Sequence, residues 1–256
     1  WEEAHGVPRD VWRQAGDHGL LCCWLPEALG GPGADLLFDF IVSEELGRIG
    51  ATGPGFPLHS IIVAPDLAAH GRPELQQALL PAMVRGDKIA AIAMTEPGTG
   101  SDVAAIRTQA RREGEHYVLT GQKTFITNGH NADLVVVACK TDPAQGAHGV
   151  SLLVVERDMP GFTRGRNLRK IGQHAQDTAE LFFDQVRVPA SHLLGDEGQG
   201  FKYLMQKLAQ ERLLISVQCQ ARAEAVLDWT VAYVQERRAF RQRLADFQNT
   251  RFKLAQ

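Results

Sequence analysis

The sequence predicts an α+β protein in which a helical segment, a segment of short strands and a second helical segment follow one another. Apolar residues recur at helical spacing through the first ninety residues and again after residue 200. Between these segments the apolar runs are short, rich in β-branched residues and separated by Gly, Asn and Asp. We therefore expect an N-terminal helical domain over 1–90, an antiparallel β-domain over 91–200 and the beginning of a helical bundle over 201–256.

The first segment contains four stretches with helical periodicity. They run over Val11–Leu21, from Asp35 to about Leu46, near Ile61–His70 and over Pro73–Val84. Asp35 is placed to cap the second helix, because an Asp side chain accepts hydrogen bonds from the free N–H groups of a first turn. The Gly-rich sequence at 30–33 predicts a loop.

The middle segment predicts about seven strands, arranged as a small barrel or sandwich. They are expected over Ile89–Met94, Arg107–Glu113, His116–Leu119, Gln122–Thr127, Leu134–Cys139, Gly149–Val155 and Ala179–Val188. The sequences at 112–115 and 128–129 are typical of tight turns between strands. The Gly-rich stretch 195–200 closes the segment, and helical spacing then continues to the last residue.

Composition excludes several classes of protein. The net charge is −3 and no block of five like charges occurs, which argues against nucleic-acid binding and against a polybasic membrane-surface protein. No apolar run is long enough to cross a bilayer. The four cysteines lack metal-ligand spacing, so we expect free thiols and no metal site. Free thiols and the Ala- and Arg-rich composition favour the bacterial cytoplasm, with the mitochondrial matrix as the alternative.

A loop rich in Gly and hydroxyl groups, Met94–Asp102, follows the first predicted strand. Such a loop can bring backbone N–H groups and hydroxyls close to a phosphate or a flat heterocycle. The plain alternative is an ordinary connection between strands. The strand Gln122–Thr127 places Phe125 and Thr127 on one face, where they could contact a ring system. The alternative there is a core Phe beside a Thr at the strand edge.

Two clusters in the last segment carry charge. Glu211 lies among Leu208, Leu213 and Leu214, and a desolvated carboxylate of this kind can act as general base toward a weakly acidic C–H. The alternative is a surface Glu with a helical ion-pair partner. Residues 236–240, followed by Gln248, combine arginines with an aromatic and could hold a pyrophosphate. The alternative is a solvated helix face.

Taken together, these segments resemble the acyl-CoA dehydrogenase family over the whole chain. Met94–Asp102 is similar to that family's long signature loop, and Gly121–Gly129 is similar to its second flavin segment. Gly53–Phe56, Ala175–Phe183 and Gln210–Ile215 resemble the long-chain branch most closely.

The resemblance implies a helical domain, a β-domain and a C-terminal helical bundle, of which this chain holds only the start. It implies FAD between the β-domain and the bundle, and a homodimer or homotetramer in which Arg237 and Gln248 reach the FAD of a neighbouring subunit. By resemblance, FAD contacts fall on Met94, Thr95, Gly100, Ser101, Phe125, Ile126, Thr127, Arg237 and Gln248. Acyl-CoA contacts fall on Ser101, Ala209, Gln210 and Arg212.

The resemblance also assigns a base and a reaction. The long-chain and isovaleryl branches place their catalytic Glu on the helix that Gln210–Ile215 resembles, which makes Glu211 the expected base. The implied reaction is FAD-dependent α,β-dehydrogenation of a medium- or long-chain fatty acyl-CoA to the trans-2-enoyl-CoA. An electron-transfer flavoprotein would accept the electrons. The alternatives are an acyl-CoA oxidase of the same fold and a truncated or degenerate module that binds without catalysis.

Overall fold

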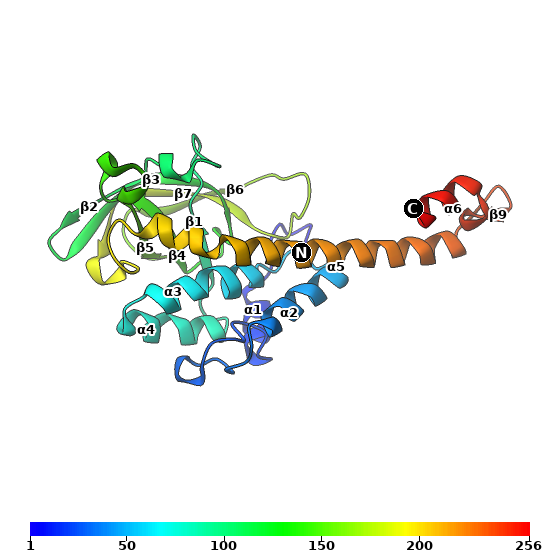
Figure 1. Ribbon diagram of the computed structural model, residues 1–256, viewed down its shortest axis with the longest axis horizontal. Coiled ribbons are helices and arrows are strands. Elements are labelled where there is room, and N and C mark those ends of the chain that lie inside the picture. Colours follow the sequence, from blue (N-terminus) through cyan, green and yellow to red (C-terminus); the bar gives the residue numbers. More distant parts are fainter.

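The computed structural model describes residues 1–256. A broad body contains a β-sheet and a layer of helices beside it, and one long helix leaves this body and carries the C-terminus at its far end (Figure 1). The order of elements is helices, strands and helices, as the sequence predicts. The division at residues 90 and 200 into three domains stays a prediction.

The N-terminal helices are α1 (Arg9–Asp17), α2 (Leu37–Arg48), α3 (Ala64–His70) and α4 (Pro73–Val84). All four lie where the periodicity predicted them, and α4 has the predicted bounds. The Oδ1 atom of Asp35 accepts a hydrogen bond from the N–H of Leu37 at 2.9 Å, which supports the expected start of α2. A π-helical segment, Leu58–Val63, precedes α3 directly and was not anticipated.

Seven strands form one sheet in the order β1-β4-β2-β3-β7-β6, with β5 paired to β4. They are β1 (Ala90–Ala93), β2 (Gln109–Glu113), β3 (His116–Thr127), β4 (Leu134–Lys140), β5 (Val150–Glu156), β6 (Phe162–Asn167) and β7 (Thr178–Pro189). The two strands expected over 116–127 are one continuous strand, β3. The polar strand β6 was not predicted, because four of its six residues are Thr, Arg, Arg and Asn.

The pairing is mainly antiparallel and differs from the expected antiparallel sheet at β4. β1 runs parallel to β4 over four residue pairs, and one further pair joins β2 to β4 in parallel. The loop that follows β1 and the β2–β3 hairpin together form the connection between β1 and β4. A connection of this length can return the chain to run parallel, whereas a short hairpin cannot.

Apolar side chains fill both faces of the sheet. Val136 and Val154 belong to a cluster that also contains Leu79 and Leu80 of α4, so this face packs on the N-terminal helices. The opposite face has its own cluster. Every residue of β4 is buried, which explains why its sequence is a continuous apolar run instead of an alternating one. All four cysteines are free, as expected.

The long helix α5 (Gly200–Glu236) packs its first two thirds on the body. Beyond it, β8 (Arg238–Ala239) and β9 (Gln242–Arg243) form a small hairpin, and α6 (Gln248–Ala255) follows. The prediction that helical structure continues through residues 236–240 is therefore wrong. Phe240 and Arg241 both have left-handed backbones, with φ of 51° and 65°, which is the geometry of a two-residue hairpin turn. No helix of the structure combines the length and the apolar character needed to cross a membrane.

Candidate functional site

The loop after β1 is held against β3 by backbone hydrogen bonds. The N–H of Thr124 donates to the carbonyl of Thr95 at 3.0 Å, and Glu96 and Thr99 close a turn through two bonds of 2.9 and 3.0 Å. The backbone is open within this turn and just after it, because a Cβ added at Gly98 or Gly100 would meet no atom within 4 Å. Ser101 is exposed in the same stretch. The loop therefore offers accessible N–H and hydroxyl groups on a fixed base.

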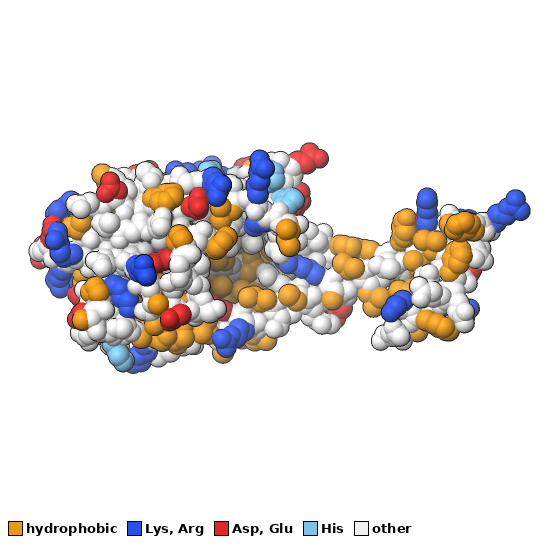
Figure 2. Space-filling view, turned by 90° about the horizontal axis from the view of Figure 1, so that it is seen from above, with side chains coloured by type: hydrophobic (Ala, Val, Ile, Leu, Met, Phe, Trp, Pro, Cys, Tyr) orange, Lys and Arg blue, Asp and Glu red, His pale blue; other side chains and the backbone are white.

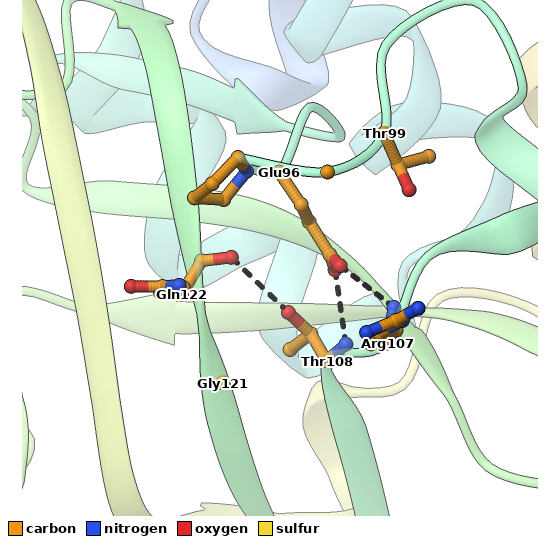
Figure 3. Close-up of a pocket in the computed structure, with 8 residues that line it drawn as sticks. Glu96, Thr99, Arg107, Thr108, Gly121 and Gln122 are labelled. Atoms are coloured by element: carbon orange, nitrogen blue, oxygen red, sulfur yellow. Dashed lines mark hydrogen bonds between the residues drawn. The ribbon is translucent and has the colours of Figure 1, made fainter.

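A buried ion pair anchors this loop. The ammonium of Lys123 donates to Glu96 at 2.9 Å and to the carbonyl of Met94 at 2.8 Å, with side-chain exposures of 0% for Lys123 and 7% for Glu96. Glu96 also accepts from the N–H groups of Arg107 and Thr108, at 2.7 and 2.9 Å (Figure 3). Burial by itself would raise the pKa of Glu96, but these donors and the Lys charge lower it. Sequence reasoning missed this pair, although both residues lie inside the two predicted flavin segments.

A cavity lies beside Glu96, between the turn 96–99, residues 107–108 and strand β3. It has a volume of about 440 Å³ and is lined by Glu96, Pro97, Gly98, Thr99, Arg107, Thr108, Gly121 and Gln122 (Figure 3). Neither Thr127 nor Glu211 lines it. It is therefore separate from the place where the predicted base lies.

A bulge in β3 turns Phe125 outward. The pairing of β3 with β7 shifts register between Lys123 and Ile126, and Phe125 has a left-handed φ of 60°. Its side chain is 67% exposed, so the alternative of a core Phe is wrong. Ile126 is buried in the sheet core, and it can offer only its backbone to a ligand. Phe125 and Thr127 thus flank a buried residue and both reach solvent.

Glu211 lies on α5, half-buried, and no Lys, Arg or His side chain is within ion-pair distance of it. The alternative of a surface Glu in an ion pair therefore does not hold. Burial raises the pKa of Glu211, and the neighbouring charge of Arg212 opposes this. A carboxylate in this state keeps its basicity for proton abstraction.

A second carboxyl, Asp66 of α3, lies near Glu211 and was missed by sequence reasoning. Asp66 is 1% exposed, and its Oδ1 atom has no hydrogen-bond partner. Burial raises the pKa of Asp66 to about 7, while Lys207 lowers it and Glu211 raises it further. Because Asp is common on helix surfaces, its burial could be read only from the packing of α3 against α5.

The residues expected beside the base occupy different environments. The side-chain amide of Gln210 donates to the carbonyl of Ile61 at 3.1 Å, which ties it to the N-terminal helices. Ala209 and Arg212 are exposed. Gln210 could therefore contact a ligand only if this bond were exchanged.

A largely apolar cleft lies between Thr127 and the face of α5 that follows Glu211. It has a volume of about 300 Å³ and lies between α5 on one side and residues 46–62, Thr127 and the segment 173–176 on the other. Ile215, one helical turn after Glu211, is part of its wall. Figure 2 shows a hollow with an apolar floor near the middle of the molecule, on the side of the broad body from which α5 extends. Thr127 and the helical face that follows Glu211 thus meet in one place.

Arg237 and Gln248 lie elsewhere. Arg237 lies between the end of α5 and the β8–β9 hairpin, and Gln248 is the first residue of α6, both far from the body (Figure 1). Met94 and Thr95 follow β1, which lies in the body. Within one chain the structure does not bring these two residues to the loop after β1.

Three family models match the chain. They describe the N-terminal domain of acyl-CoA dehydrogenase (residues 1–87), its middle domain (91–186) and its C-terminal domain (198–256). The mouse mitochondrial long-chain specific acyl-CoA dehydrogenase is 48% identical over 100% of this chain and 60% of its own length. The chain thus spans about three fifths of the length of this relative and of the pig and rat long-chain enzymes that it also matches.

Solved structures agree with this relationship. The acyl-CoA dehydrogenase from Geobacillus kaustophilus superimposes with a TM-score of 0.96 at 52% identity, covering 100% of this chain and 68% of that one. A glutaryl-CoA dehydrogenase from Mycobacterium smegmatis in complex with FADH2 gives a TM-score of 0.89 at 32% identity, covering 100% of this chain and 64% of that one. The expected α+β fold is confirmed, and the chain belongs to the acyl-CoA dehydrogenase family.

Proposed function

We propose that this chain forms the part of an FAD-dependent acyl-CoA dehydrogenase that carries the catalytic base. The reaction is α,β-dehydrogenation of a medium- or long-chain fatty acyl-CoA to the trans-2-enoyl-CoA. One observation carries the proposal: Glu211 is half-buried, has no ion-pair partner and lies one turn from an apolar cleft that also contains Thr127. An acyl chain is apolar, and a carboxylate beside such a chain is a suitable base for its α-proton.

The residues around Thr127 fit a flavin. An exposed Phe125 offers a flat apolar surface, and Thr127 beside it offers a hydroxyl. Glycines without neighbours and exposed Ser101 suit the approach of a phosphate to the loop 94–101. The proposed FAD contacts in this region are therefore Met94, Thr95, Gly100, Ser101, Phe125, Ile126 and Thr127. The Mycobacterium smegmatis relative is described with FADH2, which supports the same cofactor here. When bound, FAD supplies the acceptor for the β-hydride.

The chain's own contribution is to orient the substrate and to take a proton. Glu211 would accept the α-proton on its carboxylate, and burial, which raises its pKa, makes that carboxylate more basic. The apolar wall beside it excludes water, which strengthens the electrostatic interactions of the carboxylate. Ser101, Ala209, Gln210 and Arg212 are the proposed contacts of the acyl-CoA.

The segment beyond α5, which contains the β8–β9 hairpin and α6, fits a role in an oligomer. Because Arg237 and Gln248 do not approach the loop 94–101 of their own chain, the proposal has them contact the FAD of a second subunit in a homodimer or homotetramer. The proposed electron acceptor is an electron-transfer flavoprotein. Relatives come both from Bacillus subtilis and from mouse mitochondria, and we propose the bacterial cytoplasm with the mitochondrial matrix as the alternative.

An anaerobic titration tests the proposal. FAD-loaded protein is titrated with palmitoyl-CoA while the absorption of oxidised flavin is followed. We expect bleaching in the wild type and flavin reduction at least about a hundredfold slower in Glu211→Gln, because an amide cannot accept the proton. Glu224→Gln, an exposed carboxylate on the same helix, is the matched control and should bleach like the wild type.

Three outcomes would contradict parts of the proposal. Wild-type protein that holds FAD and fails to bleach would reject the dehydrogenase function. Bleaching of Glu211→Gln at the wild-type rate would reject Glu211 as base. Rapid reoxidation of the reduced flavin when air is admitted would replace the dehydrogenase by an oxidase of the same fold.

A further inference from the structure

The wall that α5 contributes to the cleft changes from apolar to polar along the helix. Glu211, Ile215, Gln218 and Arg222 are spaced by four, three and four residues on α5, so they follow one face of the helix. The last three of these line the cleft. Moving away from the base along this face, the wall changes from an aliphatic side chain to an amide and then to a guanidinium.

The opposite wall contains the same two kinds of side chain. Pro54, Leu58 and Ile62 contribute apolar surface to the cleft. Polar lining comes from Thr52 and from the segment 173–176, through Gln173 and Gln176. The cleft therefore offers polar groups as well as apolar surface along this wall, which a purely aliphatic chain would not use.

Among the polar side chains that line the cleft, Arg222 has a buried donor without a hydrogen-bond partner. Its Nε atom is buried without a hydrogen-bond acceptor, and no carboxylate lies within ion-pair distance of it. Its stem packs on α2, where its Cγ would be 3.6 Å from a Cβ added at Gly47. Arg222 also lines the cleft, so the donors of its guanidinium other than the enclosed Nε are the ones that a ligand could reach, and no carboxylate among residues 1–256 lies within ion-pair distance of them.

The acidic groups nearby have other partners. Glu44, Glu45 and Glu224 all lie within 4 Å of Arg48, and the shortest of these contacts is 2.6 Å. Glu2 accepts a hydrogen bond from Thr52 at 2.9 Å and one from the backbone of the 173–176 segment at 2.8 Å. None of these carboxylates is therefore a partner of Arg222 in this structure.

We propose that the cleft takes an acyl chain that carries a carboxylate at its far end, with Arg222 and Gln218 as its binding groups. This inference rests on the proposed function, since it names the substrate class of that same site. A carboxylate matches the planar fork of a guanidinium and can accept two hydrogen bonds from it. A methyl terminus would leave the guanidinium without an anion and would gain nothing from Gln218.

The helix sets the length of the chain that fits. Glu211 and Arg222 are eleven residues apart, which corresponds to about 16 Å along the helix axis. An extended chain with bonds of about 1.5 Å advances about 1.25 Å per carbon, so roughly a dozen carbons separate the α-carbon from the carboxylate. The preferred substrates would be dicarboxylic acyl thioesters near the length of tetradecanedioyl-CoA.

A binding experiment without turnover tests the inference. Calorimetric titration compares tetradecanedioyl-CoA with myristoyl-CoA in FAD-loaded Glu211→Gln protein, in which flavin reduction is expected to be slow, with and without the additional change Arg222→Leu. We expect Arg222→Leu to weaken binding of the dicarboxylic thioester about tenfold to a hundredfold, as for loss of a charged hydrogen bond, and to leave myristoyl-CoA bound at least as tightly. Arg222→Lys should lie between, because it keeps the charge and loses the fork. Arg111→Leu, on the exposed β2–β3 hairpin, is the control for loss of one positive charge.

The outcomes separate this inference from the proposed function. If Arg222→Leu melts at the wild-type temperature and leaves the ratio of the two affinities unchanged, then water satisfies Arg222 and the inference is wrong. If Arg222→Leu does not fold, Arg222→Lys and Gln218→Leu decide by the same ratio. If myristoyl-CoA binds, and bleaches the flavin of the wild type, while the dicarboxylic thioester does not bind, the proposed function stands and the inference fails. If neither thioester binds to FAD-loaded protein, both fail.

Discussion

Replacing Lys123 by Met should separate the loop 94–101 from the strand that supports it. The variant removes an ammonium that is fully buried between Glu96 and the carbonyl of Met94, at 2.9 and 2.8 Å. Met fills most of the same volume, so the change concerns charge and hydrogen bonding more than packing. The carboxylate of Glu96 would remain 7% exposed and keep only its backbone donors.

The expected size follows from that burial. Removing one partner of a buried ion pair costs about 3 to 5 kcal/mol, because the other charge is left without compensation. Lys88 provides the comparison: it pairs with Glu156 at 2.6 Å, but the two side chains are 33% and 35% exposed. An exposed pair contributes about 1 kcal/mol or less, so Lys88→Met should have a small effect.

Urea denaturation monitored by fluorescence measures both variants, and FAD titration measures the loop. Lys123→Met should lose several times more stability than Lys88→Met and should bind FAD more weakly. Adding Glu96→Gln to Lys123→Met should recover part of the loss, because the stranded charge is removed. Equal losses in the two single variants would refute the reasoning, since burial would then have no influence on the pair.

Two further predictions concern Asp66 and Phe125. The pKa of Asp66 is raised from 3.8 to about 7, so this group destabilises the fold increasingly as pH rises from 3.8 to 7 and by a constant amount above pH 7, and it has no effect below pH 3.8, where the folded and unfolded states are both protonated. Asp66→Asn should therefore become more stable than the wild type as pH rises, by about 3 kcal/mol between pH 5 and pH 8 in urea denaturation; a difference independent of pH would contradict the assigned charge state. Phe125→Gly should keep or gain up to about 1 kcal/mol of stability, because its φ of 60° suits glycine and its ring is exposed, while FAD affinity falls. A clear loss of thermal stability without a change in FAD affinity would show that Phe125 has a structural role.

The parts of the fold that the sequence predicted are those where one local signal dominates. Pro73 at the first position of α4 and a regular apolar stripe fixed that helix to the residue. The strand β4 was recognised because burial on both faces left an unbroken apolar run. In such segments local preference and tertiary packing favour the same structure.

The parts that were missed depend on contacts distant in sequence. The strand β6 has a polar sequence, and it forms because β7 offers it an edge to pair with. The turn at Phe240 and Arg241 lacks the Asn-Gly signal that usually marks such a backbone. At the candidate site, the Glu96–Lys123 pair joins residues 27 apart, and Asp66 meets the environment of Glu211 only through the packing of two helices. No periodicity within one segment contains this information.

The helix α5 is fixed to the body along most of its length and is free at its C-terminal end (Figure 1). Buried residues at Leu204, Leu214, Ala221 and Ala225 clamp it to the body. The ring of Trp229 also lies against the body, 3.2 Å from a Cβ added at Gly50, so the packed length from Gly200 to Trp229 is about 44 Å and the free length from there to Glu236 is about 11 Å. A displacement of the hairpin should therefore bend the unpacked end of α5. Glu211 lies within the packed part of the helix and should stay in place. Glu211, the proposed base, is thereby separated from displacements at the tip, where the proposed second subunit would bind, and a base of this kind needs accurate placement.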